Sequence, residues 1–268
     1  MRRLTIFAKG NLDVRDTLYA LKLADKVVWN GINEILRTRP SAAMARVHHE
    51  TWSRSDALIE ANGLVPTELA ARPLALGPYS AASQFSQAMF KADADVFVLS
   101  IQPDISTQLL RHRRDGFLFY PNDWRAWPTS DRAWLRESFV AVGLLDLAAS
   151  MANLARIIAK IRERSPAPIL LYNVSSVVPG DNTFSYDGLG ETFSTRIRRF
   201  NLGLIELSQR TGVSIIDVDT IVARGGADRL KYDTIHLTDD GCRAVATEVV
   251  RVLDDLGCLP GAELAHEA

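Results

Sequence analysis

Short, continuous apolar runs alternate along this sequence with longer segments in which apolar residues recur at helical spacing. The clearest run is 95–101, Asp-Val-Phe-Val-Leu-Ser-Ile, whose β-branched and apolar residues are typical of a central parallel strand. Further strands are predicted at 4–8, 169–174 and 213–218, and helices at 148–164 and 194–210. Because parallel strands need crossover helices, this order predicts an α/β fold whose parallel sheet is covered on both faces.

The N-terminal part of the chain has a less regular pattern. One long helix is predicted over 16–36, where apolar residues recur on roughly one face. A second strand is predicted at 46–51, followed by a helix with Ser53 as its N-cap. Residues 80–91 are also predicted to be helical.

The length and charge of the chain limit what it does. A sequence of 268 residues, 47% of them hydrophobic, is long enough to bury a sizeable core. No linker interrupts the alternation, so a single α/β domain is predicted over 1–260, with a short tail at 261–268. The formal net charge is −1, so no strong field attracts nucleic acid or anionic lipid. A dedicated role in binding nucleic acid is therefore not expected.

Two cysteines, Cys242 and Cys258, have neither metal-ligand spacing nor the density of a disulfide scaffold, and both are predicted to be reduced and structural. The apolar run that follows the basic N-terminus is too short for a signal-peptide core, and no apolar run reaches membrane-spanning length. A cytoplasmic location is expected. No cofactor or metal site is predicted, since the histidines His48 and His49 are adjacent on a strand and point to opposite faces.

The segment 232–241 carries the sharpest chemical signal. Asp233 stands three residues before His236, and Thr238 is placed to cap the amphipathic helix that follows. A carboxylate at this spacing accepts the Nδ1 proton of the imidazole and leaves Nε2 pointing outward as a base. The alternative is a surface aspartate and histidine that flank an ordinary helix start.

This segment resembles the last conserved block of the SGNH, or GDSL-type, hydrolases, in which Asp-x-x-His precedes Leu-Thr and the final helix. The stretch Thr211-Gly212 and the strand after it are also similar to that family. The resemblance covers the C-terminal third well and the rest of the chain loosely. It implies a three-layer α/β/α sandwich with a flavodoxin-like parallel sheet, Asp233 as the orienting acid, and His236 as the general base in ester or acyl chemistry.

The family's nucleophile block is altered in this sequence. In relatives the first strand ends in Gly-Asp-Ser, whose serine attacks the carbonyl, whereas this chain has Gly10-Asn11-Leu12. A few residues later Arg15-Asp16-Thr17-Leu18 resembles Gly-Asp-Ser-Leu, which makes Thr17 a candidate nucleophile, although its extra methyl group crowds the approach. The alternative is that Asp16 caps the first helix and Thr17 lies in its first turn.

The family's oxyanion block has a partial match. In the stretch 99–104 the amide of Gln102 stands where the family has an oxyanion-binding asparagine. Gly77 is a weaker candidate for the glycine whose N–H group assists, and a plain turn is the alternative. Ser100, at a strand end, is a further hydroxyl that lines the site, or it has only a packing role.

Three functions remain open from the sequence. The first is an ester hydrolase or acyltransferase that uses His236, Asp233 and Thr17. In the second, the chain keeps the fold and binds a ligand or partner without turning it over. In the third, His236 activates water or a substrate hydroxyl directly. The residues that we expect to line such a site are Gly10, Asn11, Asp13, Asp16 and Ser100.

Two irregular stretches are candidates for covering the site. Residues 111–134 carry several aromatic side chains among basic ones, and these suit a sugar or an acyl chain, a dimer contact, or a surface loop anchored by its own aromatics. His112 lies there in a cluster of basic residues, which either binds an anionic group of the substrate or forms a solvated surface. Residues 175–192 follow a strand end, where open α/β sheets place their ligands. The expected partner is a small-molecule or carbohydrate ester.

Overall fold

The computed structural model describes residues 2–23, 26–39, 43–177 and 191–259. The chain forms two compact units. Unit 1 consists of Met1–His49, Asp93–Ile101 and Pro166–Ala268, and unit 2 consists of Glu50–Ala92 and Gln102–Ser165. The segments of the two units alternate along the sequence, with boundaries at four places, and a single domain over 1–260 stays a prediction.

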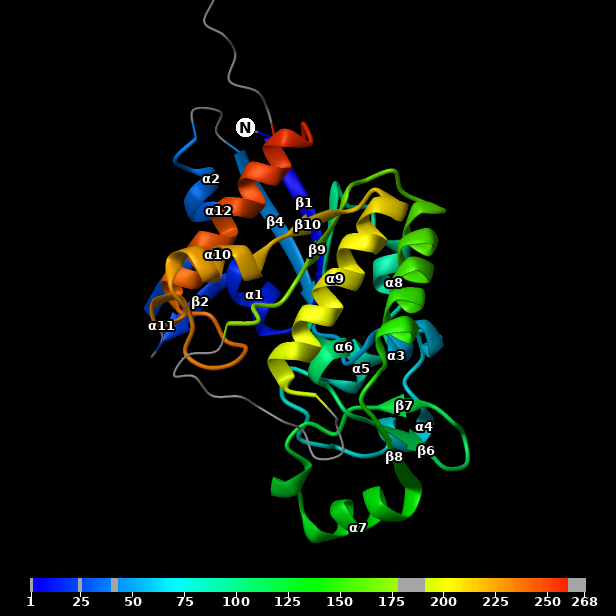
Figure 1. Cartoon of the computed structure of the whole chain (residues 1–268). Helices are drawn as coiled ribbons and strands as arrows, with labels where there is room; N and C mark the ends of the chain where they lie inside the picture. Colours follow the sequence, from blue (N-terminus) through cyan, green and yellow to red (C-terminus); the bar gives the residue numbers. More distant parts are fainter. Residues whose placement is uncertain (1, 24–25, 40–42, 178–190, 260–268) are drawn as a thin grey trace, which may run out of the picture. The chain divides into compact units, whose positions relative to one another are not determined.

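A parallel sheet forms the centre of unit 1 (Figure 1). Its strands are β1 (Arg2–Lys9), β4 (Ala43–Glu50), β5 (Val96–Ser100), β9 (Ile169–Tyr172) and β10 (Ser214–Ile216). They lie in the order β10-β9-β5-β1-β4, and β1, β5, β9 and β10 pair in parallel. This is the flavodoxin-like order, whose ligand crevice lies outside the carboxyl ends of the strands at β1 and β5.

Helices cover both faces of this sheet. The helices of unit 1 are α1 (Leu12–Leu18), α2 (Ile32–Leu36), α9 (Phe193–Thr211), α10 (Val218–Gly225), α11 (Ala227–Leu230) and α12 (Asp239–Asp255). Figure 1 shows α2 and α12 on one side of the strands and α9 on the other. Alternate side chains of β1 and β5 pack with the apolar face of α12 in one core, for example Ile6, Val98 and Val249. The three-layer α/β/α sandwich is therefore confirmed.

The predicted long helix over 16–36 is wrong. The first helix ends at Leu18, and a two-stranded antiparallel sheet follows, made of β2 (Ala20–Leu23) and β3 (Lys26–Asn30). Gly31 then takes a φ of 62°, and a Cβ atom there would collide with the carbonyl group of Leu18. The spacing of the apolar residues in 16–36 matches a helix. The segment is nevertheless divided, because the turn at Gly31 has a backbone conformation that glycine adopts more easily than other residues.

Unit 2 contains mostly short elements. They are α3 (Ser55–Glu60), α4 (Thr67–Ala70), α5 (Ala81–Gln84), η1 (Ala88–Lys91), α6 (Gln102–Ser106), β6 (Leu109–His112), β7 (Leu118–Phe119), η2 (Trp124–Ala126), α7 (Thr129–Ser138), β8 (Phe139–Gly143) and α8 (Leu147–Arg162). The strands form an antiparallel sheet in the order β7-β6-β8. The predicted helix over 80–91 is wrong as one element, because it is split into α5 and η1.

Ser53 does not cap α3, and the N-cap position belongs to Arg54. The stretch 111–134 holds much of the unit's own core: Trp127 and Trp134 are buried together with Phe119 and Phe139. Of the three interpretations of this stretch, the burial of these side chains favours the one in which its aromatic residues anchor their own region. Among the described residues, no helix combines the length and apolar character needed to cross a bilayer.

Candidate active site

The loop between α11 and α12 closes on itself at its base. Lys231 and Leu237 form an antiparallel bridge, and the backbone N–H of Tyr232 donates to the carbonyl of His236 at 2.9 Å. Thr238 caps α12, because its Oγ1 accepts the N–H of Gly241 at 3.1 Å. The segment 231–238, which we call the histidine loop, is thus fixed at both ends.

Within the histidine loop, one carboxylate holds the imidazole. Asp233 Oδ1 accepts the N–H groups of Ile235 and His236, each at 2.8 Å. Asp233 Oδ2 lies 2.7 Å from His236 Nδ1. Partial burial raises the pKa of Asp233, but the hydrogen bonds from His236 and Ile235 outweigh it, so the pKa lies below its usual value. Side-chain exposure of 46% for His236 leaves room for a reactant at the ring.

A tight turn follows β1 at the carboxyl edge of the sheet. A Cβ atom at Gly10 would lie 2.6 Å from Val14 Cγ2, so only glycine lets α1 begin this close to the strand. Asn11 occupies the N-cap position of α1 and is buried. The Gly10 carbonyl lies 3.0 Å from His49 Nε2, and the burial of this imidazole lowers the pKa of His49.

Buried polar side chains from α1 and from the ends of β5 and β9 lie in unit 1 beyond this turn. The hydroxyl of Ser100, at the end of β5, donates to Asp13 Oδ2. Burial raises the pKa of Asp13, and the second carboxylate oxygen, Oδ1, has no hydrogen-bond partner. Tyr172 pairs with Ser100 in register at the end of β9, and its hydroxyl is also buried without a partner. Tyr172 was not among the predicted site residues, although its place at the end of a predicted strand was a usable signal.

Thr17 lies inside α1. Its side chain is fully buried, and Oγ1 donates to the carbonyl of Asp13 at 2.5 Å, one helical turn earlier. This is the geometry of a packing residue, and it does not favour attack on a substrate. Asp16 accepts a hydrogen bond from Arg15 Nε at 2.7 Å, and its carbonyl accepts the indole N–H of Trp29 at 2.9 Å. Asp16 therefore does not cap α1, which begins at Leu12.

The two predicted oxyanion residues belong to unit 2. Gln102 is the first residue of α6, and its Nε2 donates to Ser106 Oγ at 2.7 Å. Gly77 has a φ of 55° and lines a cavity of about 320 Å³ together with Arg72 and Ser80. The oxyanion role of both residues stays a prediction.

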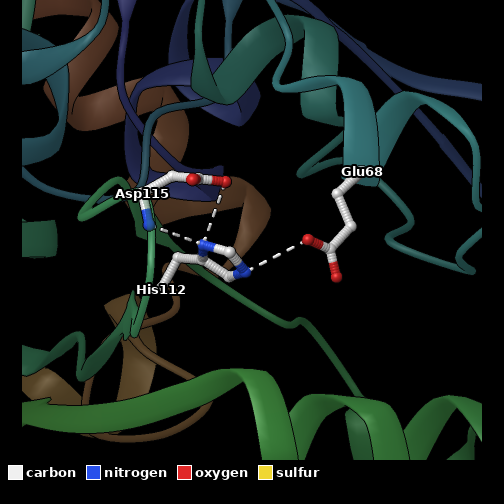
Figure 2. Close-up of side chains that lie close together, drawn as sticks. All are labelled: Glu68, His112 and Asp115. Carbon is white, nitrogen blue, oxygen red and sulfur yellow. Dashed lines mark hydrogen bonds and ion pairs between the residues drawn. The ribbon is translucent and has the colours of Figure 1, made fainter.

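Glu68, His112 and Asp115 form a compact cluster in unit 2 (Figure 2). Figure 2 shows the two carboxylates at opposite nitrogens of one imidazole, with Glu68 3.2 Å from Nε2 and Asp115 3.3 Å from Nδ1. The backbone N–H of Asp115 donates to Nδ1 at 3.1 Å, which places the proton of neutral His112 on Nε2, toward Glu68. One metal ion binds one imidazole nitrogen, so this geometry suits a hydrogen-bonded network better than a metal site.

Two of the three arginines next to His112, Arg111 and Arg114, form ion pairs within unit 2. Arg111 contacts Glu60 at 3.1 Å, and Arg114 contacts Asp115 at 3.0 Å. These pairs favour a structural role for the cluster over the binding of an anionic substrate. Of the second predicted cover, 175–192, the part 178–190 lies outside the described residues.

Comparison with solved structures places the fold. The chain is similar to the lipase/acylhydrolase from Enterococcus faecalis, with 12% identity, a TM-score of 0.53 and coverage of 97% of this chain and 98% of that one. An acetylxylan esterase from Geobacillus stearothermophilus is also similar, with 12% identity, a TM-score of 0.52 and coverage of 92% and 93%. A protein from Parabacteroides merdae that is described as a GDSL-like lipase is similar too, with 11% identity, a TM-score of 0.50 and coverage of 94% of this chain and 95% of that one. No family model matches the sequence, and a search of curated proteins gives no match. These likenesses show an SGNH-type fold.

Proposed function

We propose that this protein catalyses the hydrolysis or transfer of an ester-linked acyl group, with His236 as the general base. The pair formed by His236 and Asp233 carries the proposal. The carboxylate engages Nδ1 at 2.7 Å and is itself fixed by two backbone N–H groups, so the ring is held in one tautomer with Nε2 as the basic nitrogen. The fold shared with lipases and acetylxylan esterases supports this class of chemistry.

The attacking group in this proposal is water or a substrate hydroxyl. Leu12 follows the Gly10-Asn11 turn where related sequences carry a serine, and the hydroxyl of Thr17 is buried and bonded to the backbone. A histidine that is paired with a carboxylate can deprotonate an oxygen nucleophile without a covalent acyl-enzyme. Hydrolysis and acyl transfer then differ only in whether water or an acceptor alcohol provides that oxygen.

The test is turnover of a short aryl acetate and an acetylated sugar by the parent protein and single variants. His236→Ala is expected to lower kcat/KM by about 100-fold or more, because it removes the general base. Asp233→Asn is expected to give a smaller loss, since the ring keeps a neighbour but loses the charge that stabilises imidazolium. Thr17→Val, which removes only a buried hydroxyl, is expected to keep the parent's rate.

Two results contradict parts of this proposal. Equal turnover in the parent and His236→Ala excludes the histidine as the base. A loss of turnover in Thr17→Val equal to that in His236→Ala restores covalent attack by threonine.

A second candidate is a protein that binds an ester-like ligand without turnover. The absence of a serine at the turn after β1 favours it, because this is the nucleophile's place in the family that the sequence resembles. Calorimetric binding of a sugar acetate, with no turnover in the parent, would support this candidate over the enzyme.

A further inference from the structure

A buried lysine lies at the base of the histidine loop. Lys231 follows the last residue of α11, and only 4% of its surface is exposed. Its Nζ donates to the carbonyl of Thr234 and to the carbonyl of Val177, each at 2.7 Å. A buried ammonium group is costly unless it is hydrogen-bonded, so these contacts are what keep Lys231 in place.

The two carbonyls belong to different parts of unit 1. Thr234 lies between Asp233 and His236, so the first bond crosses the inside of the histidine loop. Val177 follows the carboxyl end of β9, so the second bond ties the loop to the edge of the sheet. One side chain thus couples the position of the imidazole to the strands.

The anchor at Val177 is itself held. The N–H of the preceding residue, Ser176, donates to Asp219 Oδ1 at 2.7 Å, and its hydroxyl donates to the same oxygen at 3.1 Å. Asp219 and Asp233 also favour the charged form of Lys231 electrostatically, whereas burial has the larger effect and lowers the pKa of Lys231 to about 8. The amine of Lys231 is therefore connected to Asp233 in two ways: through its hydrogen bond to the adjacent residue Thr234, and through the attraction between the two charges.

We propose that Lys231 is a positioning residue for the His236 site, which bonds Thr234 and Val177 so that Asp233 and His236 keep the geometry of proton transfer. The proposal rests on the proposed function of His236. It assigns no contact with substrate to Lys231. Its consequence is that the loss of these two bonds impairs the chemical step more than substrate binding.

The test compares Lys231→Met with the parent and with Lys160→Met. Methionine approximates the length of the side chain but donates to neither carbonyl. Lys160 is a matched control on α8 of unit 2, where its Nζ donates to Gln87 Oε1 at 2.8 Å. We expect Lys231→Met to lower kcat about tenfold to 100-fold with KM nearly unchanged, because small displacements of a catalytic group have effects of this size. Lys160→Met is expected to retain the parent's kcat.

A second readout does not depend on turnover. In protein with ¹⁵N-labelled histidine, the Nδ1 proton of His236 gives a downfield resonance because it is hydrogen-bonded to Asp233, and His236→Ala identifies the signal. We expect Lys231→Met to shift or broaden this resonance, while Lys160→Met leaves it in place. If the parent shows no turnover, the proposed function fails but this measurement still decides the role of Lys231.

Lys231→Gln covers the case in which Lys231→Met does not fold, since its amide keeps a donor nitrogen but is too short to reach both carbonyls. The same decrease in kcat and the same change in the resonance are expected. A folded Lys231 variant with a lower melting temperature, the parent's kcat and an unaltered His236 resonance would show a purely structural lysine and overturn the proposal.

Discussion

Replacing Arg54 by methionine is expected to lower the free energy of unfolding of unit 2 by about 3 to 5 kcal/mol, as removal of one partner from a buried ion pair does elsewhere. Arg54 is 1% exposed, and its guanidinium binds the Asp56 carboxylate through Nε at 2.9 Å and Nη2 at 2.8 Å. Nη1 donates to the carbonyls of Thr107 at 3.1 Å and Gly143 at 2.6 Å. Methionine fills similar space but leaves all these acceptors without the cation.

Urea unfolding followed by tryptophan fluorescence measures this effect, because Trp52, Trp124, Trp127 and Trp134 all lie in unit 2. Arg125→Met is the matched control at an exposed position, where a change within about 0.5 kcal/mol is expected. Adding Asp56→Asn to Arg54→Met is expected to recover part of the loss, since it removes the charge left behind. An Arg54→Met protein as stable as Arg125→Met would contradict the proposed role of the buried pair.

Unit 2 is expected to lose about 2 kcal/mol of stability as the pH rises from about 4 to neutral, through Asp104 alone. Its fully buried carboxyl accepts the N–H of Ser55 at 2.7 Å and the hydroxyls of Ser55 and Ser150, each at 2.6 Å. Burial nevertheless dominates and raises the pKa of Asp104 from 3.8 to about 6. Between these values the folded protein binds a proton that the unfolded chain does not, so the free energy of unfolding falls as the pH rises.

Asp104→Asn should remove this dependence, because asparagine keeps an acceptor for the Ser55 N–H and carries no charge. The measurement is the difference in unfolding free energy between pH 4 and pH 7, which we expect to shrink by about 2 kcal/mol relative to the parent. Asp146→Asn, at the exposed N-cap of α8, controls for the substitution itself. The same pH difference in the parent and Asp104→Asn would exclude a proton on Asp104 as its cause.

The central sheet and the helices α9 and α12 of unit 1 were predictable because their signals are local. The run 95–101, rich in β-branched and apolar residues, is typical of a buried strand, and α12 begins directly after Thr238, whose hydroxyl caps it. The pairing of Asp233 with His236 was also predictable, because a separation of three residues on one loop brings the two side chains together.

The remaining features depend on contacts that are distant in sequence. The hairpin within 16–36 is specified by a turn at Gly31 that periodicity does not reveal. Tyr172 reads as one more apolar strand residue until the register places it beside Ser100. Lys231 has the sequence context of a surface lysine, and one of the two bonds that hold its buried amine goes to Val177, 54 residues away in sequence.

The path of the chain between the two units has a consequence for how the molecule is made. Unit 2 is complete at Ser165, whereas unit 1 still lacks β9, β10 and the histidine loop at that point. During translation all of unit 2 is therefore synthesised before β9 and β10, which complete the sheet that contains β1, β4 and β5. The histidine loop is synthesised after unit 2 is complete, so a product terminated between residues 165 and 231 has unit 2 but lacks the pair formed by Asp233 and His236.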